Sequence, residues 1–370
     1  MIAPLKKHVF VTLDKNYHQY YWCLILIDLN KQNINNQGDK EHFISVLAPA
    51  RLHLGFIDMH GGMGRSFGSL GLCLDEIFTH LVATASQDVI IQGPSSGRAS
   101  VYAGKILEYL GEKQGVKMVI KQAIPGHAGL GSGTQLSLAV GTAIASIYDK
   151  QLGIRKIAEI MDRGTRSGIG VGAFSMGGFL VDGGRGTNTQ VPPIISHIFF
   201  PESWRVLLVF DHDKAGVHGK REKLAFQHLP PMDQRVTEYL CRLTLMQVLP
   251  ALVEQECEKF GSAITEIQQQ VGDHFSNAQG GRYCSELVAK ILPELLEHGA
   301  TGIGQSSWGP TGFAIFANET QAHKALKHVR ETWNDHKNVT FKVCKARNEK
   351  ALINKNIQDN LENINYKSIS

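Results

Sequence analysis

The chain has 370 residues, including 38 glycines and six cysteines, and its 38 basic and 34 acidic residues give a net charge of +4. The length suggests about two domains, and a hydrophobic content of 43% excludes whole-chain disorder and a fibrous repeat. No basic run is interleaved with aromatic residues, so we expect no nucleic-acid partner. The cysteines lack C-x-x-C pairing and metal-ligand spacing, which indicates reduced thiols and a cytoplasmic location.

Composition divides the chain into four parts. An apolar run at 20–27 ends at Asp28 and is too short to span a membrane, so we expect an extra strand or a poorly ordered extension and no membrane partner. Asn-rich residues complete an N-terminal extension and linker, and a polar tail closes the chain. The predicted parts are the extension and linker at 1–42, an N-terminal domain at 43–190, a C-terminal domain at 191–347 and the tail at 348–370.

The predicted elements follow from hydrophobic periodicity and turn residues. In the first domain we expect strands at 43–56, 88–91 and 116–124, and helices at 100–110, 134–148 and 154–164. In the second we expect strands at 204–210, 313–317 and 339–343, and helices at 233–249, 252–271, 285–298 and 319–334. Strands and helices alternate without regular βαβ spacing, which favours an α+β fold over a doubly wound sheet.

A glycine-rich loop, PGHAGLGSGTQ at 125–135, joins a predicted strand to a predicted helix. Small residues let the backbone approach a ligand closely, and the N–H groups at a helix start form an anion site. The hydroxyls of Ser132 and Thr134 suit either a helix cap or a phosphate oxygen. No lysine follows the glycines as it does in the P-loop of nucleoside triphosphatases. Taken alone, the loop is equally compatible with an ordinary strand–helix turn.

The loop resembles the phosphate-binding loop of the GHMP kinase superfamily, and two further superfamily segments flank it in the right order. These are APARLHLG at 48–55 and GIGQSSWGPTG at 302–312. The resemblance implies a GHMP-kinase-like two-domain fold, with an N-terminal domain like ribosomal protein S5 domain 2 and a ferredoxin-like C-terminal domain. It also implies that phosphate or pyrophosphate lies on the residues Gly129, Leu130, Gly131, Ser132, Gly133 and Thr134.

One segment departs from the kinase pattern. In SGIGVGAF at 167–174, Gly170 stands where many of these kinases carry an aspartate, and a glycine cannot accept a hydroxyl proton. Together with RLHLGF, GGFLVDGG and GQSSWGP, this segment is similar to the β-ribofuranosylaminobenzene 5′-phosphate synthase family, the superfamily's non-kinase branch in methanopterin biosynthesis. The resemblance implies that 4-aminobenzoate or 4-hydroxybenzoate is joined to phosphoribosyl pyrophosphate (PRPP), forming a C-riboside 5′-phosphate with release of CO₂ and pyrophosphate.

Two alternatives remain open at this point. One is an ATP-dependent GHMP-type small-molecule kinase, and the other is a non-catalytic phosphate-ligand-binding protein of the same fold. Under the synthase hypothesis the substrates are PRPP and a para-substituted benzoate. Mg²⁺ bound through the phosphates, with Ser132 as a candidate ligand, is the expected cofactor, and we expect no organic one. Family analogy implies a homodimer.

Residues in and near the motifs are candidates for the chemistry. An arginine fork suits a phosphate or a carboxylate, and a tryptophan can stack on an arene. The candidate catalytic residues are Arg51, His53, Arg166, Gln305 and Trp308. The candidate substrate-binding residues are Asp58, Arg65, Asp211, Ser306 and Ser307. Each also has a plain structural alternative, such as a surface arginine, a buried histidine, an exposed ion pair or a tryptophan in the interdomain core.

Overall fold

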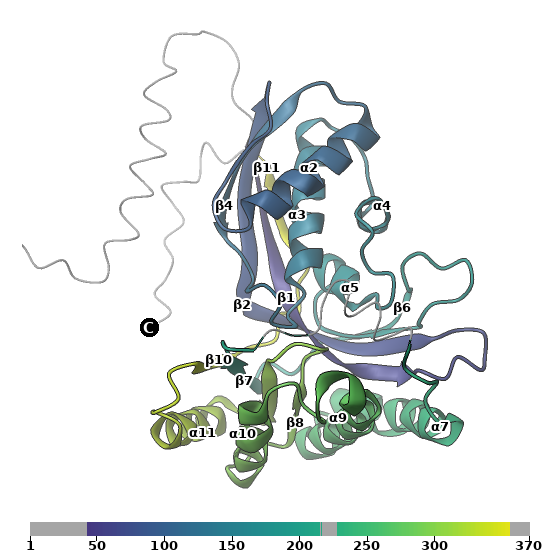
Figure 1. The fold of residues 1–370 in the computed structure, drawn as a ribbon, viewed down its shortest axis with the longest axis vertical. Helices are drawn as coiled ribbons and strands as arrows, with labels where there is room; N and C mark the ends of the chain where they lie inside the picture. Colours follow the sequence, from purple (N-terminus) through teal and green to yellow (C-terminus); the bar gives the residue numbers. More distant parts are fainter. Residues whose placement is uncertain (1–42, 215, 217–227, 356–370) are drawn as a thin grey trace, which may run out of the picture. The chain divides into compact units, whose positions relative to one another are not determined.

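The computed structural model describes residues 43–214, 216 and 228–355 (Figure 1). The extension and linker predicted at 1–42 lie outside the described residues, as does the tail beyond residue 355. Within the described residues an α+β fold is confirmed, with one mixed sheet and one antiparallel sheet.

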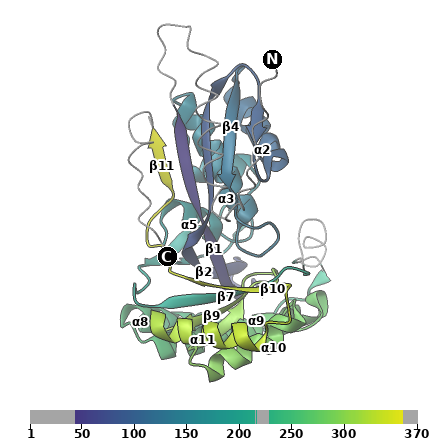
Figure 2. The same ribbon diagram turned by 90° about the vertical axis from the view of Figure 1, so that its left-hand side faces the viewer.

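The first sheet has seven strands, and helices pack on one of its faces (Figures 1 and 2). Its central strands run in the order β11-β1-β2-β4-β3, while β5 pairs with β2 and β6 pairs with β5. The strands are β1 (Ile44–Asp58), β2 (Phe67–Ser86), β3 (Ile90–Gln92), β4 (Gly115–Gln122), β5 (Phe179–Asp182), β6 (Ile194–Ile198) and β11 (Leu352–Lys355). The helices are α2 (Ser96–Leu110), α3 (Ser132–Ile147), α4 (Ile154–Ile160) and α5 (Ile169–Ser175).

The second sheet has four antiparallel strands in the order β10-β7-β9-β8. These are β7 (Arg205–Asp211), β8 (Gly302–Gln305), β9 (Gly312–Phe316) and β10 (Val339–Cys344). The helices are α7 (Gln234–Leu243), the π-helical turn η1 (Thr244–Val248), α8 (Leu249–Val253), α9 (Cys257–Gln279), α10 (Glu286–Glu297) and α11 (Glu319–Thr332).

Side-chain alternation divides the core of the second sheet between two sets of helices. Val206 and Leu208 of β7 join the core that contains α9 and the second half of β1. Leu207 and Val209, which point to the opposite face, pack with α10 and α11. The long strand β1 therefore reaches from the first sheet to α9, and a Cβ on Gly55 would lie only 2.8 Å from Ile267 Cγ2.

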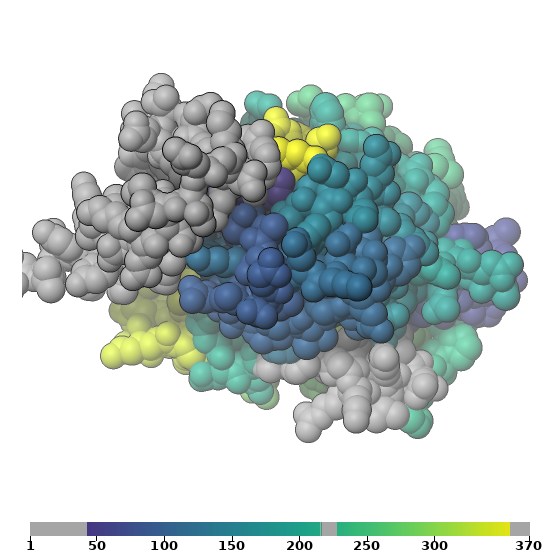
Figure 3. Space-filling view, turned by 90° about the horizontal axis from the view of Figure 1, so that it is seen from above, coloured from purple at the N-terminus to yellow at the C-terminus, as the bar shows by residue number. Residues whose placement is uncertain are grey.

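Two predicted boundaries differ from the structure. β6 pairs with β5 in the first sheet, so the N-terminal domain extends past the boundary predicted at residue 190. Residues 352–355, which we expected in the polar tail, form β11 and pair with the start of β1. In the space-filling view, yellow residues at the C-terminal end lie beside the purple start of β1 (Figure 3). The side chain of Ala351 is buried beside this strand.

One described stretch, Gln234–Val253, is long and apolar enough to cross a membrane by length and composition. The stretch contains the π-helical turn and packs Leu240, Val248 and Leu252 into the core. Core helices of soluble proteins pass the same test, so this stretch is weak evidence for a membrane span.

Candidate active site

The glycine-rich loop turns sharply into α3. Gly129 and Gly131 have φ values of +78° and +83°, in the left-handed region that favours glycine. Gly131 is the N-cap of α3, and no described side chain caps the helix. The N–H groups of the first turn of this 16-residue helix are therefore available to an anion, and the helix dipole favours one there.

Arginine side chains surround this helix start. A Cβ placed on Gly131 would come within 3.3 Å of Arg51 Cγ, and one on Gly133 within 3.5 Å of Arg163 Nη1. Arg51 Nη1 also donates to the carbonyl oxygen of Gly129 at 2.5 Å. Guanidinium groups bind phosphate oxygens in pairs, so the loop has the charge that a phosphate or pyrophosphate needs.

Arg163, which the sequence analysis missed, is held in place by Tyr102. Its Nη2 donates to the Tyr102 hydroxyl, and its guanidinium lies 5.4 Å from the centre of that ring. Its Nε is buried and has no hydrogen-bond partner among the described residues. The predicted Arg166 is half-buried in the connection between α4 and α5, and its catalytic role stays a prediction.

Ser306, in the turn between β8 and β9, fastens the C-terminal domain to the loop. Its buried hydroxyl accepts from the N–H of His53 at 3.0 Å and donates to the carbonyl oxygen of Gly129 at 2.7 Å. The N–H of Ser307 donates to the carbonyl oxygen of His53 at 3.3 Å. A Cβ on Gly129 would lie 2.2 Å from the Ser306 carbonyl oxygen, so only glycine fits. The Ser306 hydroxyl thus has a structural use, and substrate binding by Ser306 and Ser307 stays a prediction.

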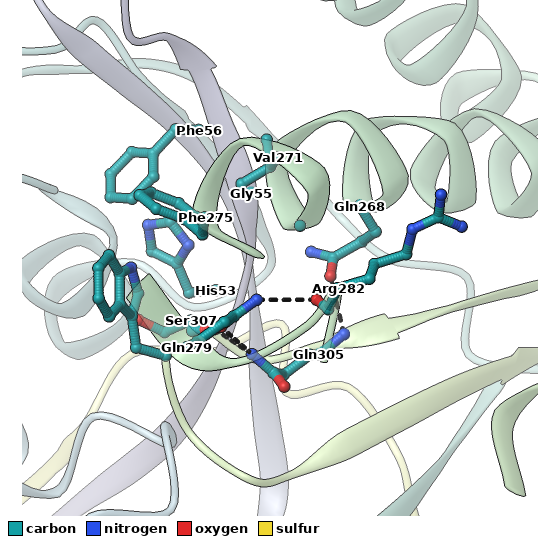
Figure 4. A pocket seen from close by; sticks show the side chains of 12 residues that line it. His53, Gly55, Phe56, Gln268, Val271, Phe275, Gln279, Arg282, Gln305 and Ser307 are labelled. Carbon is teal, nitrogen blue, oxygen red and sulfur yellow. Dashed lines mark hydrogen bonds between the residues drawn. The ribbon is translucent and has the colours of Figure 1, made fainter. Parts of the chain in front are cut away.

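An aromatic cavity lies beside this junction, between β1, α9 and the β8–β9 turn (Figure 4). Phe275 packs edge-on against Trp308 with 4.6 Å between ring centres, and Phe56 packs against His53 at the same separation. The cavity volume is about 20 Å³, which is room for one water molecule. Trp308 is buried in its wall, as either a stacking residue or a core residue would be.

His53 is a neutral imidazole in this wall. Its side chain is 3% exposed, and Nε2 has no hydrogen-bond partner in the part of the chain that the structure describes. Burial, and to a smaller extent the charge of Arg51, lower the pKa of His53 from 6.5 to about 3. The group therefore offers hydrogen bonding at neutral pH and carries no charge there.

Gln305 organises the polar side of the cavity. Its side-chain oxygen accepts from the N–H of Cys284 at 2.6 Å, and its amide nitrogen donates to Gln279 Oε1 and to the carbonyl oxygen of Ser307 at 3.2 and 3.0 Å. Its backbone N–H donates to Gln268 Oε1 at 2.7 Å. These bonds hold the β8–β9 turn against α9, which makes Gln305 a positioning residue in this structure.

The predicted substrate residues Asp58 and Arg65 have structural partners in this structure, and their contact with substrate stays a prediction. Asp58 is seven residues along β1 from Arg51, or about 23 Å at about 3.3 Å per residue. Its carboxylate accepts from the N–H groups of His60 and Gly61 at 3.0 and 2.8 Å and so closes a turn. Arg65 donates to two carbonyl oxygens of the segment after β5, each at 2.7 Å.

The predicted Asp211 is a helix anchor. It lies buried at the end of β7, and its Oδ2 accepts from the hydroxyl of Ser285 at 2.6 Å. Ser285 is the N-cap of α10, and its hydroxyl accepts in turn from the N–H of Val288 at 3.1 Å. Asp211 therefore sets the start of α10, and its contact with substrate stays a prediction.

Gly170 lies in α5 against the first turn of α3. A Cβ at this position would lie 3.0 Å from Thr134 Cγ2, so a larger side chain would have to displace Thr134. The carbonyl oxygen of Gly170 accepts from Gln135 Nε2 at 2.7 Å. The nearby carboxylate of Asp182 is buried, and burial raises its pKa. It accepts from the N–H groups of Gly168 and Gly184 at 2.8 and 2.9 Å, which gives it a structural role.

Comparisons with known proteins show the family to which the chain belongs. The GHMP kinases N terminal domain matches residues 99–178, and the GHMP kinases C terminal domain matches 248–335. Beta-ribofuranosylphenol 5′-phosphate synthase of Methanothermobacter thermautotrophicus is 32% identical over 72% of this chain and 87% of that protein. The protein of the same name from Archaeoglobus fulgidus is 37% identical over 72% and 86%. The chain belongs to the β-ribofuranosylphenol 5′-phosphate synthase family.

Solved structures place this synthase family member in the GHMP kinase fold. Homoserine kinase from Cytophaga hutchinsonii superposes with a TM-score of 0.63 at 17% identity, covering 87% of this chain and 100% of that one. Mevalonate diphosphate decarboxylase from Staphylococcus aureus has a TM-score of 0.60 at 13% identity, covering 85% and 98%. At these identities the matches establish the fold alone, and they confirm the two-domain α+β prediction.

Proposed function

We propose that the chain joins 4-hydroxybenzoate to PRPP and releases CO₂ and pyrophosphate. The name of its relatives describes a phenol that carries a ribose 5′-phosphate, and a phenol oxygen corresponds to hydroxybenzoate rather than aminobenzoate. One structural observation carries the proposal. Arg51 and Arg163 lie at the start of α3, whose N–H groups suit an anion, while Gly170, which the resemblance aligns with the aspartate of many kinases, packs against Thr134.

In the proposed reaction, ribose C1 loses its bond to pyrophosphate, and one ring carbon exchanges its bond to the carboxylate for a bond to C1. The bond between ribose C1 and the pyrophosphate oxygen breaks, and the ring carbon that carries the carboxylate bonds to C1. The carboxylate then leaves as CO₂, and the electron pair of its bond restores the aromatic ring. Because the ribose passes through an oxocarbenium-like state, water is the competing nucleophile and the site must exclude it.

The residues at the loop fit the leaving group. The first-turn N–H groups of α3, with Arg51 and Arg163, would hold pyrophosphate and stabilise the charge that grows as the bond breaks. Orientation of these donors before the reaction is what makes such stabilisation effective. The buried Nε of Arg163 is a further donor with no described partner.

The side chains that line the aromatic cavity suit 4-hydroxybenzoate, but the present cavity is too small to hold its ring. Phe56, Phe275 and Trp308 suit an arene, and Nε2 of His53 suits a hydrogen bond to the phenol hydroxyl. A cavity that holds benzene has about 150 Å³, against about 20 Å³ here. Ring binding therefore requires Phe275 or Trp308 to move.

Mg²⁺ belongs to the proposal as a companion of the pyrophosphate. The charged side chains nearest the loop glycines are arginines, so these residues offer no carboxylate cage for the ion. The donors present fit an ion carried in by pyrophosphate, with the Ser132 hydroxyl as one protein ligand. Bound there, Mg²⁺ would supply further positive charge to the leaving group.

We also propose a homodimer in the cytoplasm. Leu245, Met246 and Val253 lie along the helical run from η1 to α8, and each is at least 63% exposed. Apolar side chains gathered on one element are typical of a contact surface. Sedimentation or light scattering of wild type and of Met246→Lys would test the contact, because a charge in the interface should favour the monomer.

A product assay tests the proposed reaction. The protein is incubated with PRPP, Mg²⁺ and carboxyl-labelled 4-hydroxybenzoate or 4-aminobenzoate, and CO₂ and pyrophosphate are measured. We expect the two products in equal amounts, with faster turnover of 4-hydroxybenzoate. Substrate-dependent ADP formation from ATP would instead support the kinase alternative. PRPP binding without turnover of either benzoate would support a non-catalytic ligand-binding protein and refute the proposal.

A further inference from the structure

Three potential metal ligands meet on the outer helices of the C-terminal domain. Glu294 lies in the last turn of α10, His298 follows as the C-cap of that helix, and His328 lies on α11. One ligand atom of each residue lies within 4.8 Å of those of the other two. These helices pack on the face of the second sheet opposite to α9 and β1 (Figures 1 and 2), so the cluster is separate from the proposed active site.

The cluster is already organised around the Glu294 carboxylate. Glu294 Oε1 lies 2.6 Å from His328 Nε2, and Oε2 accepts from Trp333 Nε1 at 2.8 Å. The rings of His298 and His328 have their centres 3.6 Å apart. All three side chains are half-buried, so they are ordered by packing and remain accessible to an ion.

We propose that Glu294, His298 and His328 bind a divalent transition-metal ion of the Zn²⁺ type, with water as a fourth ligand. Two imidazole nitrogens and one carboxylate oxygen form a recognised zinc donor set, whereas Mg²⁺ and Ca²⁺ prefer oxygen donors. Zinc ligands about 2.0–2.2 Å from the ion lie roughly 3.4 Å from one another. The present separations, 2.6 Å between Glu294 Oε1 and His328 Nε2 and at most 4.8 Å within the cluster, lie on both sides of that spacing.

Two observations favour a metal over a simple ion pair. The two rings lie 3.6 Å apart, and a nitrogen of each lies within 4.8 Å of a Glu294 carboxylate oxygen, so three donor atoms meet at one place, whereas an ion pair needs two. Trp333 fixes one carboxylate oxygen and leaves the other facing the imidazoles, as a second-shell partner does in metal sites.

The ion would stabilise the domain and take no part in the chemistry. It would tie the C-terminal end of α10 to α11. The N-terminal end of α10, about 18 Å away at about 1.5 Å per residue, is fixed through Ser285 and Asp211. The helix would then be held at both ends, so bound metal should raise the melting temperature and leave turnover unchanged.

Zinc titration of the metal-free full chain by calorimetry tests the site. Wild type is compared with His298→Gln and Glu294→Gln, each of which removes one ligand. His323→Gln is the matched control, since His323 also lies one helical turn from a glutamate, Glu319, at 3.7 Å, but is not part of the cluster. We expect one Zn²⁺ site in wild type and His323→Gln that weakens at least 100-fold in each ligand variant. Trp333→Phe should weaken it about 10- to 100-fold.

Two further measurements do not depend on the enzyme's activity. Added Zn²⁺ should raise the melting temperature of wild type and of His323→Gln, and should leave that of His298→Gln unchanged. Visible absorption of bound Co²⁺ should be lost in the ligand variants, while far-ultraviolet circular dichroism confirms that they are folded. Equal Zn²⁺ affinity and stoichiometry in wild type, His298→Gln and His323→Gln would overturn the proposal, whatever the result of the product assay.

Discussion

Burial of His53 should make the protein lose stability as the pH falls. The unfolded chain takes up a proton on this group near pH 6.5, while the folded protein resists protonation until about pH 3. The stability that depends on neutral His53 is therefore fully present above pH 6.5 and is lost as the pH falls. At about 1.36 kcal/mol per pH unit, the loss reaches about 2 kcal/mol at pH 5 and about 5 kcal/mol below pH 3.

Replacing His53 with glutamine isolates this effect, because glutamine does not titrate. Urea unfolding of wild type and His53→Gln at pH 7.5, 6.0 and 5.0 gives the free energy of unfolding at each pH. Between pH 7.5 and 5.0, wild type should lose about 2 kcal/mol more than the variant. The exposed His323→Gln serves as the control and should follow wild type. Equal losses in wild type and His53→Gln would show that His53 is not a buried neutral group.

The remaining predictions concern the loop and the arginines around it. Ser306→Ala should lower the free energy of unfolding by about 1–3 kcal/mol, since it leaves the buried N–H of His53 unpaired, while Arg51 still donates to the carbonyl oxygen of Gly129; a loss under about 0.5 kcal/mol in urea unfolding would contradict the junction. Arg163→Gln should weaken PRPP binding at least 10-fold by calorimetry and lower the melting temperature only slightly, whereas a purely structural arginine would give the reverse. Gly131→Asp places a carboxylate and a strained φ at the helix start and should abolish PRPP binding; unchanged affinity would exclude the loop as the anion site.

The sequence predicted the elements whose pattern is local. The strand at 116–124 and the helix at 134–148 correspond to β4 and α3 within two residues at each end. The twenty-residue strand β2 escaped prediction, because Gly68 and Gly71 interrupt its pattern and its pairing with β1 is a tertiary feature.

Helix α5 was not predicted either, because tertiary packing rather than local helix propensity determines it. Gly170 and Gly172 have low helix propensity, and yet both are required by close packing. A Cβ on Gly172 would lie 2.8 Å from Ile194 Cδ1 and 2.9 Å from Leu180 Cδ1. Tertiary contact thus fixes a helix where local preference favours a loop.

The residues of the candidate site also differ in whether a local sequence pattern could identify them. Arg51 and the loop were found because a motif marks them, whereas Arg163 and Phe275 come from other elements and carry no motif. Asp58 lies seven residues along the extended strand β1 from Arg51, which is about 23 Å in space, so its contact with substrate stays a prediction. Only the fold decides which charges around a motif reach it.

Glycines allow the two domains to touch backbone to backbone at their junction. A Cβ on Gly309 would lie 2.4 Å from the backbone nitrogen of Gly129, so the β8–β9 turn and the anion loop touch backbone to backbone. Ser306 joins this contact to His53, which lines the aromatic cavity. A pyrophosphate on the loop would therefore sit one hydrogen-bonded link from the wall of the proposed arene site. In the proposed reaction, that arrangement would bring ribose C1, still bonded to pyrophosphate, toward the ring carbon that must attack it, and the same few glycines would then serve both anion binding and domain contact.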